Sequence, residues 1–315
     1  MKLRGIHHIT AIATDPQQNL DFYTEVLGLR FVKRTVNFDD PGSYHFYFGD
    51  RVGSPGTIIT FFPWPGSRRG TRGTGQVVAA SFALPTNALE YWKDRLSRER
   101  VPVEEAAPRF GQRVLRFPDP DGLMLELIES DHADAGGIND EADVSAEHAL
   151  HGFDAPTLEV QSAELTEKLL TEVFGFELSG EEKGRRRFSL GSDHPANRID
   201  LTERREAGFG HIAAGTVHHI AFRAATDEEH IEWRSKLAEL GFGVTPIIDR
   251  QYFHSIYFRE PGGILFEIAT DNPGFAIDEP VEHLGESLRL PPQYEEHRSA
   301  IAQALPPITL HTSRA

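Results

Sequence analysis

The sequence contains no cysteine among its 315 residues and only two methionines. Disulfide bonds, thiolate metal sites and a cysteine nucleophile are therefore excluded. Any metal ion that the protein binds has to be held by imidazole and carboxylate groups, a set of donors that suits Fe, Mn, Zn, Ni or Co.

An excess of basic residues and long hydrophobic runs are also missing. The formal net charge is −16, which argues against nucleic acid as a partner and against docking on anionic membrane surfaces. No apolar run approaches the roughly 18 residues that a membrane span needs. The first residues lack the apolar stretch of a signal peptide. We therefore expect a cytoplasmic protein with neither a nucleic-acid nor a membrane partner.

What the sequence does contain is a duplication of its two halves. Residues 5–29 align with residues 152–176 at a constant offset of 147. Residues 120–127 align with residues 261–268 at an offset of 141. Self-similarity of this kind is the signature of a fold built from repeated units.

Each half divides again into two similar units. Every unit opens with a β-branched or alternating stretch that is typical of a strand. An amphipathic segment follows, in which apolar residues such as Leu20, Tyr23 and Leu27 recur three and four positions apart and indicate a helix. Shorter strand-like runs complete the unit. The sequence thus predicts an α+β fold of four βαβββ modules, at about residues 5–65, 74–130, 150–205 and 214–270.

The four modules are expected to pair into two domains, an N-terminal one at residues 1–130 and a C-terminal one at residues 148–270. Residues 131–147 are rich in Asp, Glu, Ala and Gly and are predicted to be a linker. Residues 271–315 contain six prolines, too many for a further module. They are predicted to form a tail that packs on the body of the protein.

Two histidine pairs and one glutamate form the candidate metal site. His7-His8 opens module one and His218-His219 opens module four. Successive side chains of a strand alternate between its faces, so only one imidazole of each pair is expected to face a given side. Glu267 lies in an apolar strand, where an unpaired carboxylate would be costly to bury. Two imidazoles and one carboxylate with open coordination positions form the facial triad of non-haem Fe(II) oxygenases.

A lone histidine in a strand is more often a packed or surface residue than a ligand. The repeats favour ligation here, because alanine stands in the corresponding place of the other modules, as Ala155 and Ala79. Histidines that served only strand packing would have no reason to occur in modules one and four alone. Glu126 is the repeat equivalent of Glu267 but lacks a matching histidine, and we predict that it is structural.

These motifs resemble the vicinal oxygen chelate superfamily, which includes glyoxalases and extradiol dioxygenases. Within it they are similar to the ring-cleaving branch that contains hydroquinone dioxygenases. The likeness covers essentially the whole chain, and it is strongest in residues 5–10, 53–57, 217–221 and 265–269. The resemblance implies that modules one and four supply the metal ligands and that the second histidine of each pair binds. The implied ligands are His8, His219 and Glu267.

The resemblance also implies which other residues take part in the reaction. His7 and His218 would lie beside the ligands, as supporting or acid–base residues. Arg250, Tyr257 and Thr10 would lie in the substrate pocket, although core packing explains Thr10 and Tyr257 equally well.

The function implied by the resemblance is that of a ring-cleaving dioxygenase of the extradiol type. It would use Fe(II), or Mn(II) in the same ligand set, to insert O2 into a hydroquinone- or catechol-type aromatic. A small aromatic substrate and O2 are the expected partners, and a homo-oligomer is the expected assembly.

Two alternatives stay open, a glyoxalase-like isomerase or lyase and a non-catalytic aromatic-binding protein of the same fold. Glyoxalase-type sites usually have four protein ligands, including two glutamates. The strand at residues 57–62 contains no carboxylate, which favours the three-ligand dioxygenase. The sequence does not identify the phenolic substrate or its substituents.

Overall fold

The computed structural model describes residues 2–130, 139, 142–191 and 195–310. The predicted linker at 131–147 therefore falls largely outside the described residues. Within them, no helix combines the length and the apolar character that crossing a membrane would require.

The first two modules have the predicted order of elements. Module one consists of β1 (Ile6–Ala13), α1 (Pro16–Asp21), the π-helical turn η1 (Phe22–Val26), β2 (Arg30–Asn37), β3 (Asp40–Gly49) and β4 (Ile58–Pro63). Module two consists of β5 (Gln76–Leu84), α2 (Leu89–Arg98), β6 (Glu104–Arg109), β7 (Gln112–Pro118) and β8 (Met124–Glu129).

Modules three and four repeat this order. Module three consists of β9 (Thr157–Val160), α3 (Glu164–Lys168), η3 (Leu169–Val173), β10 (Glu177–Glu182), β11 (Arg185–Ser189), the short helix η4 (Pro195–Asn197) and β12 (Arg198–Glu203). Module four consists of β13 (Val217–Ala224), α4 (Asp227–Glu239), β14 (Ile248–Asp249), β15 (Phe253–Arg259) and β16 (Leu265–Pro273). The remaining elements are the short helices η5 (Phe275–Ile277), η6 (Val281–His283) and η7 (Pro292–His297), and α5 (Arg298–Ala304).

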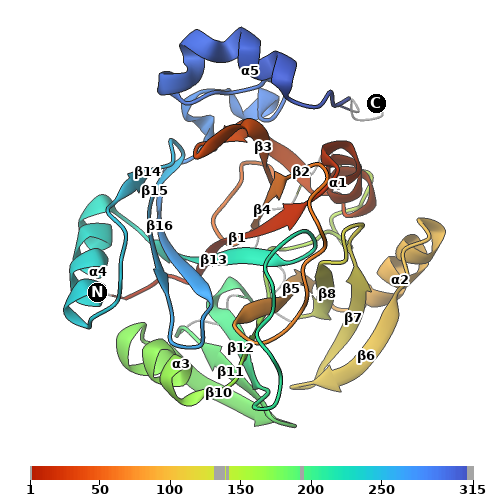
Figure 1. Ribbon diagram of the computed structural model, residues 1–315. Coiled ribbons are helices and arrows are strands. Elements are labelled where there is room, and N and C mark those ends of the chain that lie inside the picture. The colour runs from red at the N-terminus through yellow and green to blue at the C-terminus, as the bar shows by residue number, and fades with distance from the viewer. Residues whose placement is uncertain (1, 131–138, 140–141, 192–194, 311–315) are drawn as a thin grey trace.

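The modules join into two curled eight-stranded sheets. One sheet has the order β14-β15-β16-β13-β1-β4-β3-β2 and unites modules four and one. The other has the order β10-β11-β12-β9-β5-β8-β7-β6 and unites modules three and two. Figure 1 shows β1 beside β13 at the centre, with α2, α3 and α4 on the outside of the sheets. Each sheet contains one module from each half of the chain. The division into domains at residues 1–130 and 148–270 stays a prediction.

The helices of modules one and three show the duplication in detail. Each ends in a π-helical turn, η1 or η3, and each is followed by a glycine with a positive φ angle. Gly28 has a φ of 70° and Gly175 a φ of 82°. Glycine adopts this left-handed conformation without the steric cost that a Cβ atom imposes, so it ends the helix and redirects the chain into the next strand.

Strand β1 contains a β-bulge at His7. Ile6 pairs with Phe222 and His8 pairs with Ala221, so β1 has one more residue in this interval than β13. A bulge sets two residues against one on the partner strand and re-aims their side chains. The expectation that only one imidazole of the first pair faces a given side is therefore wrong.

Strand β13 contains the matching bulge at His218. Thr10 pairs with His219 and Ala11 pairs with Val217, so the extra residue now lies on β13. The second pair of imidazoles is thereby also brought to one side. The two bulges are related by the approximate two-fold axis that passes between β1 and β13.

Residues after β16 pack against module one. The ammonium group of Lys33, which is fully buried, lies 2.6 Å from a carboxylate oxygen of Asp278 and 2.5 Å from one of Glu279. The hydroxyl of Tyr44 donates a hydrogen bond of 3.0 Å to the carbonyl of Pro306. Figure 1 shows α5 next to β3, on the far side of that strand from β13. That residues 271–315 as a whole form a separate tail stays a prediction.

A buried carboxyl group joins module one to module two. Asp119 accepts hydrogen bonds from the amides of Asp121 (2.9 Å) and Leu123 (2.8 Å), and from the Tyr23 hydroxyl (3.1 Å). Burial raises the pKa of Asp119 to about 7. The pKa of a carboxyl in the unfolded chain is about 3.9. The folded protein therefore holds a proton that the unfolded chain releases between these two values.

We predict that this proton makes stability fall as the pH rises from about 4 to about 7. The free energy of unfolding decreases with pH wherever the folded state binds more protons, by up to about 1.4 kcal/mol per pH unit for one group. Asp119→Asn removes the titration and should flatten this decrease, as measured by denaturant unfolding at several pH values. The exposed variant Asp94→Asn is the control. Parallel pH profiles for Asp119→Asn and the unchanged protein would contradict the assignment.

Candidate metal centre

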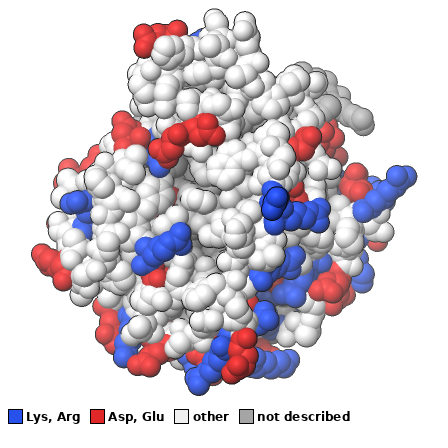
Figure 2. Space-filling model, in the orientation of Figure 1, with Lys and Arg blue, Asp and Glu red and all other residues white. Residues whose placement is uncertain are grey.

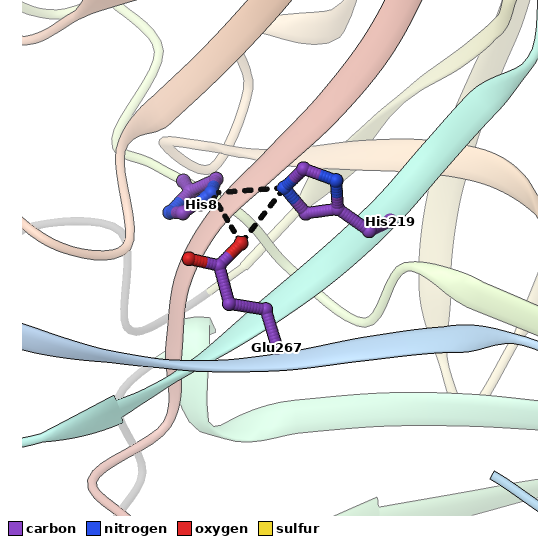
Figure 3. Close-up of side chains that lie close together, drawn as sticks. All are labelled: His8, His219 and Glu267. Atoms are coloured by element: carbon purple, nitrogen blue, oxygen red, sulfur yellow. Dashed lines mark hydrogen bonds and ion pairs between the residues drawn. The ribbon is translucent and has the colours of Figure 1, made fainter. Parts of the chain in front are cut away.

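Three side chains from neighbouring strands converge at the middle of the sheet that unites modules one and four. They are His8 from β1, His219 from β13 and Glu267 from β16 (Figure 3). The Nε2 atoms of the two histidines are 3.2 Å apart, and Glu267 Oε2 lies 3.2 Å from the first and 2.8 Å from the second. All three residues are buried. The three predicted ligands are thus brought together.

The electrostatics of the cluster favour a bound cation. Burial lowers the pKa of His219 although Glu267 opposes the shift, so this imidazole is neutral at pH 7. Burial also opposes ionisation of Glu267, but the imidazoles of His8 and His219 outweigh it and hold the pKa of the carboxyl well below its ordinary range. The site therefore presents an ionised carboxylate beside neutral imidazole.

The donor atoms of the cluster fit a divalent metal ion. Glu267 Oε1 accepts a hydrogen bond from the buried hydroxyl of Ser255. Glu267 Oε2 is also buried, yet among the described residues it has no hydrogen bond of acceptable geometry. Such an atom costs free energy unless a cation or a donor satisfies it. Two imidazole nitrogens and one carboxylate oxygen within reach of a single ion form the donor set of the facial triad.

His7 lies behind His8 and does not line the cavity described below. Its Nδ1 atom is 2.9 Å from His8 Nδ1. When His8 binds a metal ion through Nε2, its Nδ1 carries the proton and donates to His7 Nδ1. The lone pair of His8 Nε2 then faces the cluster.

His218 lies beside His219 in the two-fold-related arrangement but on the solvent side. The Nδ1 atoms of the two histidines are 2.8 Å apart. Burial, assisted by His219, lowers the pKa of His218 to about 3, so the imidazole is neutral. Its side chain lines the cavity. His218 is therefore placed to meet a bound molecule, whereas His7 is not.

A cavity of about 200 Å³ opens beside His8 and His219. Arg250 and Tyr257 line it, as the resemblance implied. The Arg250 guanidinium lies 5.5 Å from the centre of the Tyr257 ring and 3.1 Å from a carboxylate oxygen of Asp39. The other lining residues are Asn37, Phe38, Asp39, His45, Tyr47, Phe62, Trp64, His218, Phe253 and Leu265. Aromatic walls with a few polar groups are typical of a site for a small aromatic ligand.

Thr10 is not among the residues that line the cavity. It is fully buried, and its hydroxyl lies 2.9 Å from that of Thr60. Two lining residues that the sequence interpretation missed are His45 and Tyr47 of β3, whose polar atoms are 2.9 Å apart. The sequence could have indicated them. In the predicted strand at residues 44–48, alternation places Tyr44, Phe46 and Phe48 on one face and positions 45 and 47 on the other.

Figure 2 shows the surface on the side drawn in Figure 1. Acidic and basic side chains both lie on this face, the basic ones gathering toward the lower right, and large areas between the charged groups are uncharged.

A half-barrel of paired βαβββ modules, with a His-His-Glu cluster at its centre, defines the vicinal oxygen chelate fold. The chain belongs to the Glyoxalase/Bleomycin resistance protein/Dioxygenase superfamily, whose family model matches residues 5–127 and 152–268. Both halves of the chain thus match the same family independently, as the internal duplication requires.

Three relatives cover nearly the whole chain. The "Putative ring-cleaving dioxygenase MhqO" of Bacillus subtilis is 50% identical over 97% of both chains. The chlorohydroquinone/hydroquinone 1,2-dioxygenase of Sphingobium indicum is 35% identical over 93% of both chains. A crystal structure of a "putative dioxygenase" from Bacillus subtilis superposes with a TM-score of 0.93 at 49% identity, covering 98% of this chain and 99% of the other.

We predict that Glu267→Gln weakens divalent metal binding by more than ~100-fold, because it removes the only charged ligand while keeping the shape of the side chain. Affinity for Mn(II) or Co(II), measured by calorimetric titration of the metal-free protein, tests this expectation. Glu239→Gln at the exposed end of α4 is the matched control. Equal affinities for Glu267→Gln and its control would remove Glu267 from the site.

Proposed function

We propose that this protein is a non-haem Fe(II)-dependent ring-cleaving dioxygenase of the extradiol type, acting on a hydroquinone- or catechol-type aromatic. The observation that supports it most directly is the buried cluster of His8, His219 and Glu267 at the wall of an aromatic cavity. The names of the relatives, one of which specifies hydroquinone and chlorohydroquinone, support the same reaction and substrate class.

His8, His219 and Glu267 would hold the metal ion. Three protein ligands leave coordination positions free on the side of the cavity, where a phenolic oxygen and O2 can reach. Bound Fe(II) would supply the electron transfer between phenol and O2 that direct reaction of these two molecules lacks. Mn(II) suits the same donors.

His7 would fix the first ligand in its binding tautomer. The contact between the two Nδ1 atoms would hold the proton of His8 on Nδ1 and leave its Nε2 free to bind the metal ion. A ligand whose lone pair is already directed at the site binds without having to shift a proton first. Because His7 does not line the cavity, it would support metal binding without exchanging protons with substrate.

His218 is the residue placed to handle a proton. When His219 binds through Nε2, its Nδ1–H donates to His218 Nδ1, and His218 Nε2 then carries the remaining proton of that ring. His218 lines the cavity, so this N–H can donate to a substrate or oxygen atom bound there. General acid–base catalysis by a positioned imidazole contributes typically 100- to 10,000-fold (~10²–10⁴) to a rate.

The walls of the cavity would orient an aromatic ring. Phe62 and Trp64 are stacked with an interplanar angle of 13° and a centroid distance of 5.6 Å, and both line the cavity. The permanently charged guanidinium of Arg250, which directly follows β14, lies next to Tyr257 and lines the same cavity. It would stabilise the negative charge of a deprotonated phenol, since a cation that is already in place needs no reorganisation.

The two outer histidines should respond differently to replacement. We predict that His218→Ala keeps its affinity for metal but loses turnover by roughly 100- to 10,000-fold. His7→Ala should lower metal affinity by roughly 10- to 100-fold, with turnover recovering at saturating metal. Metal titration and steady-state rates on both variants distinguish these outcomes. Full turnover in metal-loaded His218→Ala would exclude a catalytic role for this residue.

Oxygen consumption tests the proposed reaction. The protein, purified anaerobically and loaded with Fe(II), is mixed with panels of hydroquinones and catechols while O2 uptake and products are followed. We expect one O2 consumed per ring-opened product, and no uptake by Glu267→Ala under the same conditions. Metal binding without O2 uptake on any phenol would rule out the dioxygenase assignment.

A further inference from the structure

The two ends of the sheet that unites modules one and four meet at the cavity. The sheet runs from β14 at one end to β2 at the other. Its curl brings these ends together, because Arg250, which directly follows β14, lies 3.1 Å from Asp39 in the turn after β2. Both residues line the cavity, as do Asn37 and Phe38. The place of Arg250 in the cavity therefore depends on how the two ends are held together.

The ion pair between Arg250 and Asp39 is too exposed to fix this arrangement by itself. The side chain of Asp39 is 75% exposed and that of Arg250 is 18% exposed. Ion pairs in contact with water contribute little to stability, because the solvent screens the charges and two flexible side chains have to be ordered. Another contact has to hold the turn on which Arg250 lies.

The turn between β14 and β15 is short, and its backbone is strained. The carbonyl of Arg250 accepts a hydrogen bond of 2.8 Å from the Tyr252 amide, and the Arg250 amide donates one of 2.9 Å to the Phe253 carbonyl. Gln251, at the tip of the turn, has a φ of 67°. This left-handed conformation is unfavourable for residues other than glycine and persists only where neighbouring contacts hold it.

Asp278 supplies such contacts from the segment that follows β16. Its Oδ2 atom accepts hydrogen bonds from Gln251 Nε2 (2.9 Å) and from the Tyr252 hydroxyl (3.1 Å). Its Oδ1 atom lies 2.6 Å from the ammonium group of Lys33 on β2. One carboxylate, whose side chain is only 19% exposed, thus joins the turn after β14 to the edge strand at the other end of the sheet.

Aromatic packing ties the same segment to the cavity. The ring of Phe275 is stacked on that of Tyr252, with the centroids 5.1 Å apart, and it packs at the same distance on Tyr47. Tyr47 lines the cavity. The segment that contains Asp278 is therefore packed directly behind a wall of the cavity.

We propose that Asp278 is a positioning residue for the substrate site. By holding the turn between β14 and β15 against β2, it keeps the guanidinium of Arg250 at the place where a deprotonated phenol binds. The site in this view includes the segment after β16 as well as the strands of modules one and four. This inference rests on the role proposed above for Arg250.

Replacing Asp278 in two backgrounds tests whether it acts through Arg250. The variants are Asp278→Ala, Arg250→Ala and the two combined, with Asp278→Asn as the conservative variant that keeps one accepting oxygen. Glu282→Gln, an exposed change of charge in the same segment, is the control. One readout is kcat/KM with a hydroquinone. The other is the affinity of the Fe(II)-loaded protein, kept without O2, for the coloured anion of 4-nitrophenol, which requires no turnover.

We expect Asp278→Ala to lower kcat/KM and the affinity for the 4-nitrophenol anion by roughly 10-fold, because a small displacement of a positioned group costs at least this much. In the Arg250→Ala background the same change should lower neither quantity further, since the group that Asp278 positions is then missing. Asp278→Asn should retain more of both quantities than Asp278→Ala. Glu282→Gln should match the unchanged protein, and Asp278→Ala should keep its affinity for Mn(II).

Equal losses in both backgrounds would show that Asp278 acts independently of Arg250 and would overturn the inference. Full kcat/KM and full affinity for the anion in Asp278→Ala would overturn it as well. Glu279 lies 2.5 Å from the Lys33 ammonium group and stays in these variants, so that buried charge keeps a partner. If Asp278→Ala does not fold by circular dichroism, Tyr252→Phe, which removes one of the hydrogen bonds to Asp278, is compared in the same two backgrounds.

Failure of the proposed function is seen separately, in the unchanged protein. If that protein binds Fe(II) and the 4-nitrophenol anion but consumes no O2 with any phenol, the proposed reaction is wrong, and the affinity for the anion still tests the role of Asp278. If it binds neither the metal nor the anion, the proposed function and the inference both fail.

Discussion

The antiparallel pairing of β1 with β13 is the contact on which the site depends. It joins the first strand of module one to the first strand of module four, which lie more than 200 residues apart in the chain. Each strand has a bulge next to its candidate ligand, and the two bulges bring His7, His8, His219 and His218 into one row. In this row each outer histidine contacts its neighbour through the Nδ1 atoms, and the two inner Nε2 atoms lie 3.2 Å apart beside Glu267. Of the outer pair, His218 lines the cavity and His7 does not.

In the second sheet, the place that corresponds to the candidate metal site has alanines instead of the two histidines. Glu126, the repeat equivalent of Glu267, is fully buried and lies 2.5 Å from an Arg109 nitrogen and 2.9 Å from one of Arg116. Burial opposes its ionisation, but these arginines lower the pKa of Glu126 to about 2. Arg109 is the repeat equivalent of Arg250. In the other sheet, Arg250 pairs with Asp39, and the imidazoles of His8 and His219 lie next to Glu267 instead. A buried carboxylate at this place needs a cation, and an arginine supplies it where a metal site is missing.

Much of this arrangement could be predicted from the sequence because repetition is visible in the order of residues. The four modules and the structural role of Glu126 follow from offsets between the repeats, whereas the choice of His8 and His219 as proposed ligands came from the family resemblance. The bulges at His7 and His218 could not be predicted, since a strand's alternation gives no sign of an extra residue until its partner is known. Thr10, a pocket residue by resemblance, instead lies with its hydroxyl 2.9 Å from that of Thr60 and does not line the cavity. His45 and Tyr47 went unrecognised because they resemble the ordinary polar face of a strand.

The central claim is that one divalent metal ion binds between His8, His219 and Glu267. Anomalous diffraction from crystals of the Fe(II)-loaded protein, recorded on both sides of the iron absorption edge, tests it most directly. The account predicts a single strong peak within bonding distance of the two Nε2 atoms and Glu267 Oε2. A peak at any other cluster of side chains, or none in crystals whose protein retains iron by chemical assay, would contradict it.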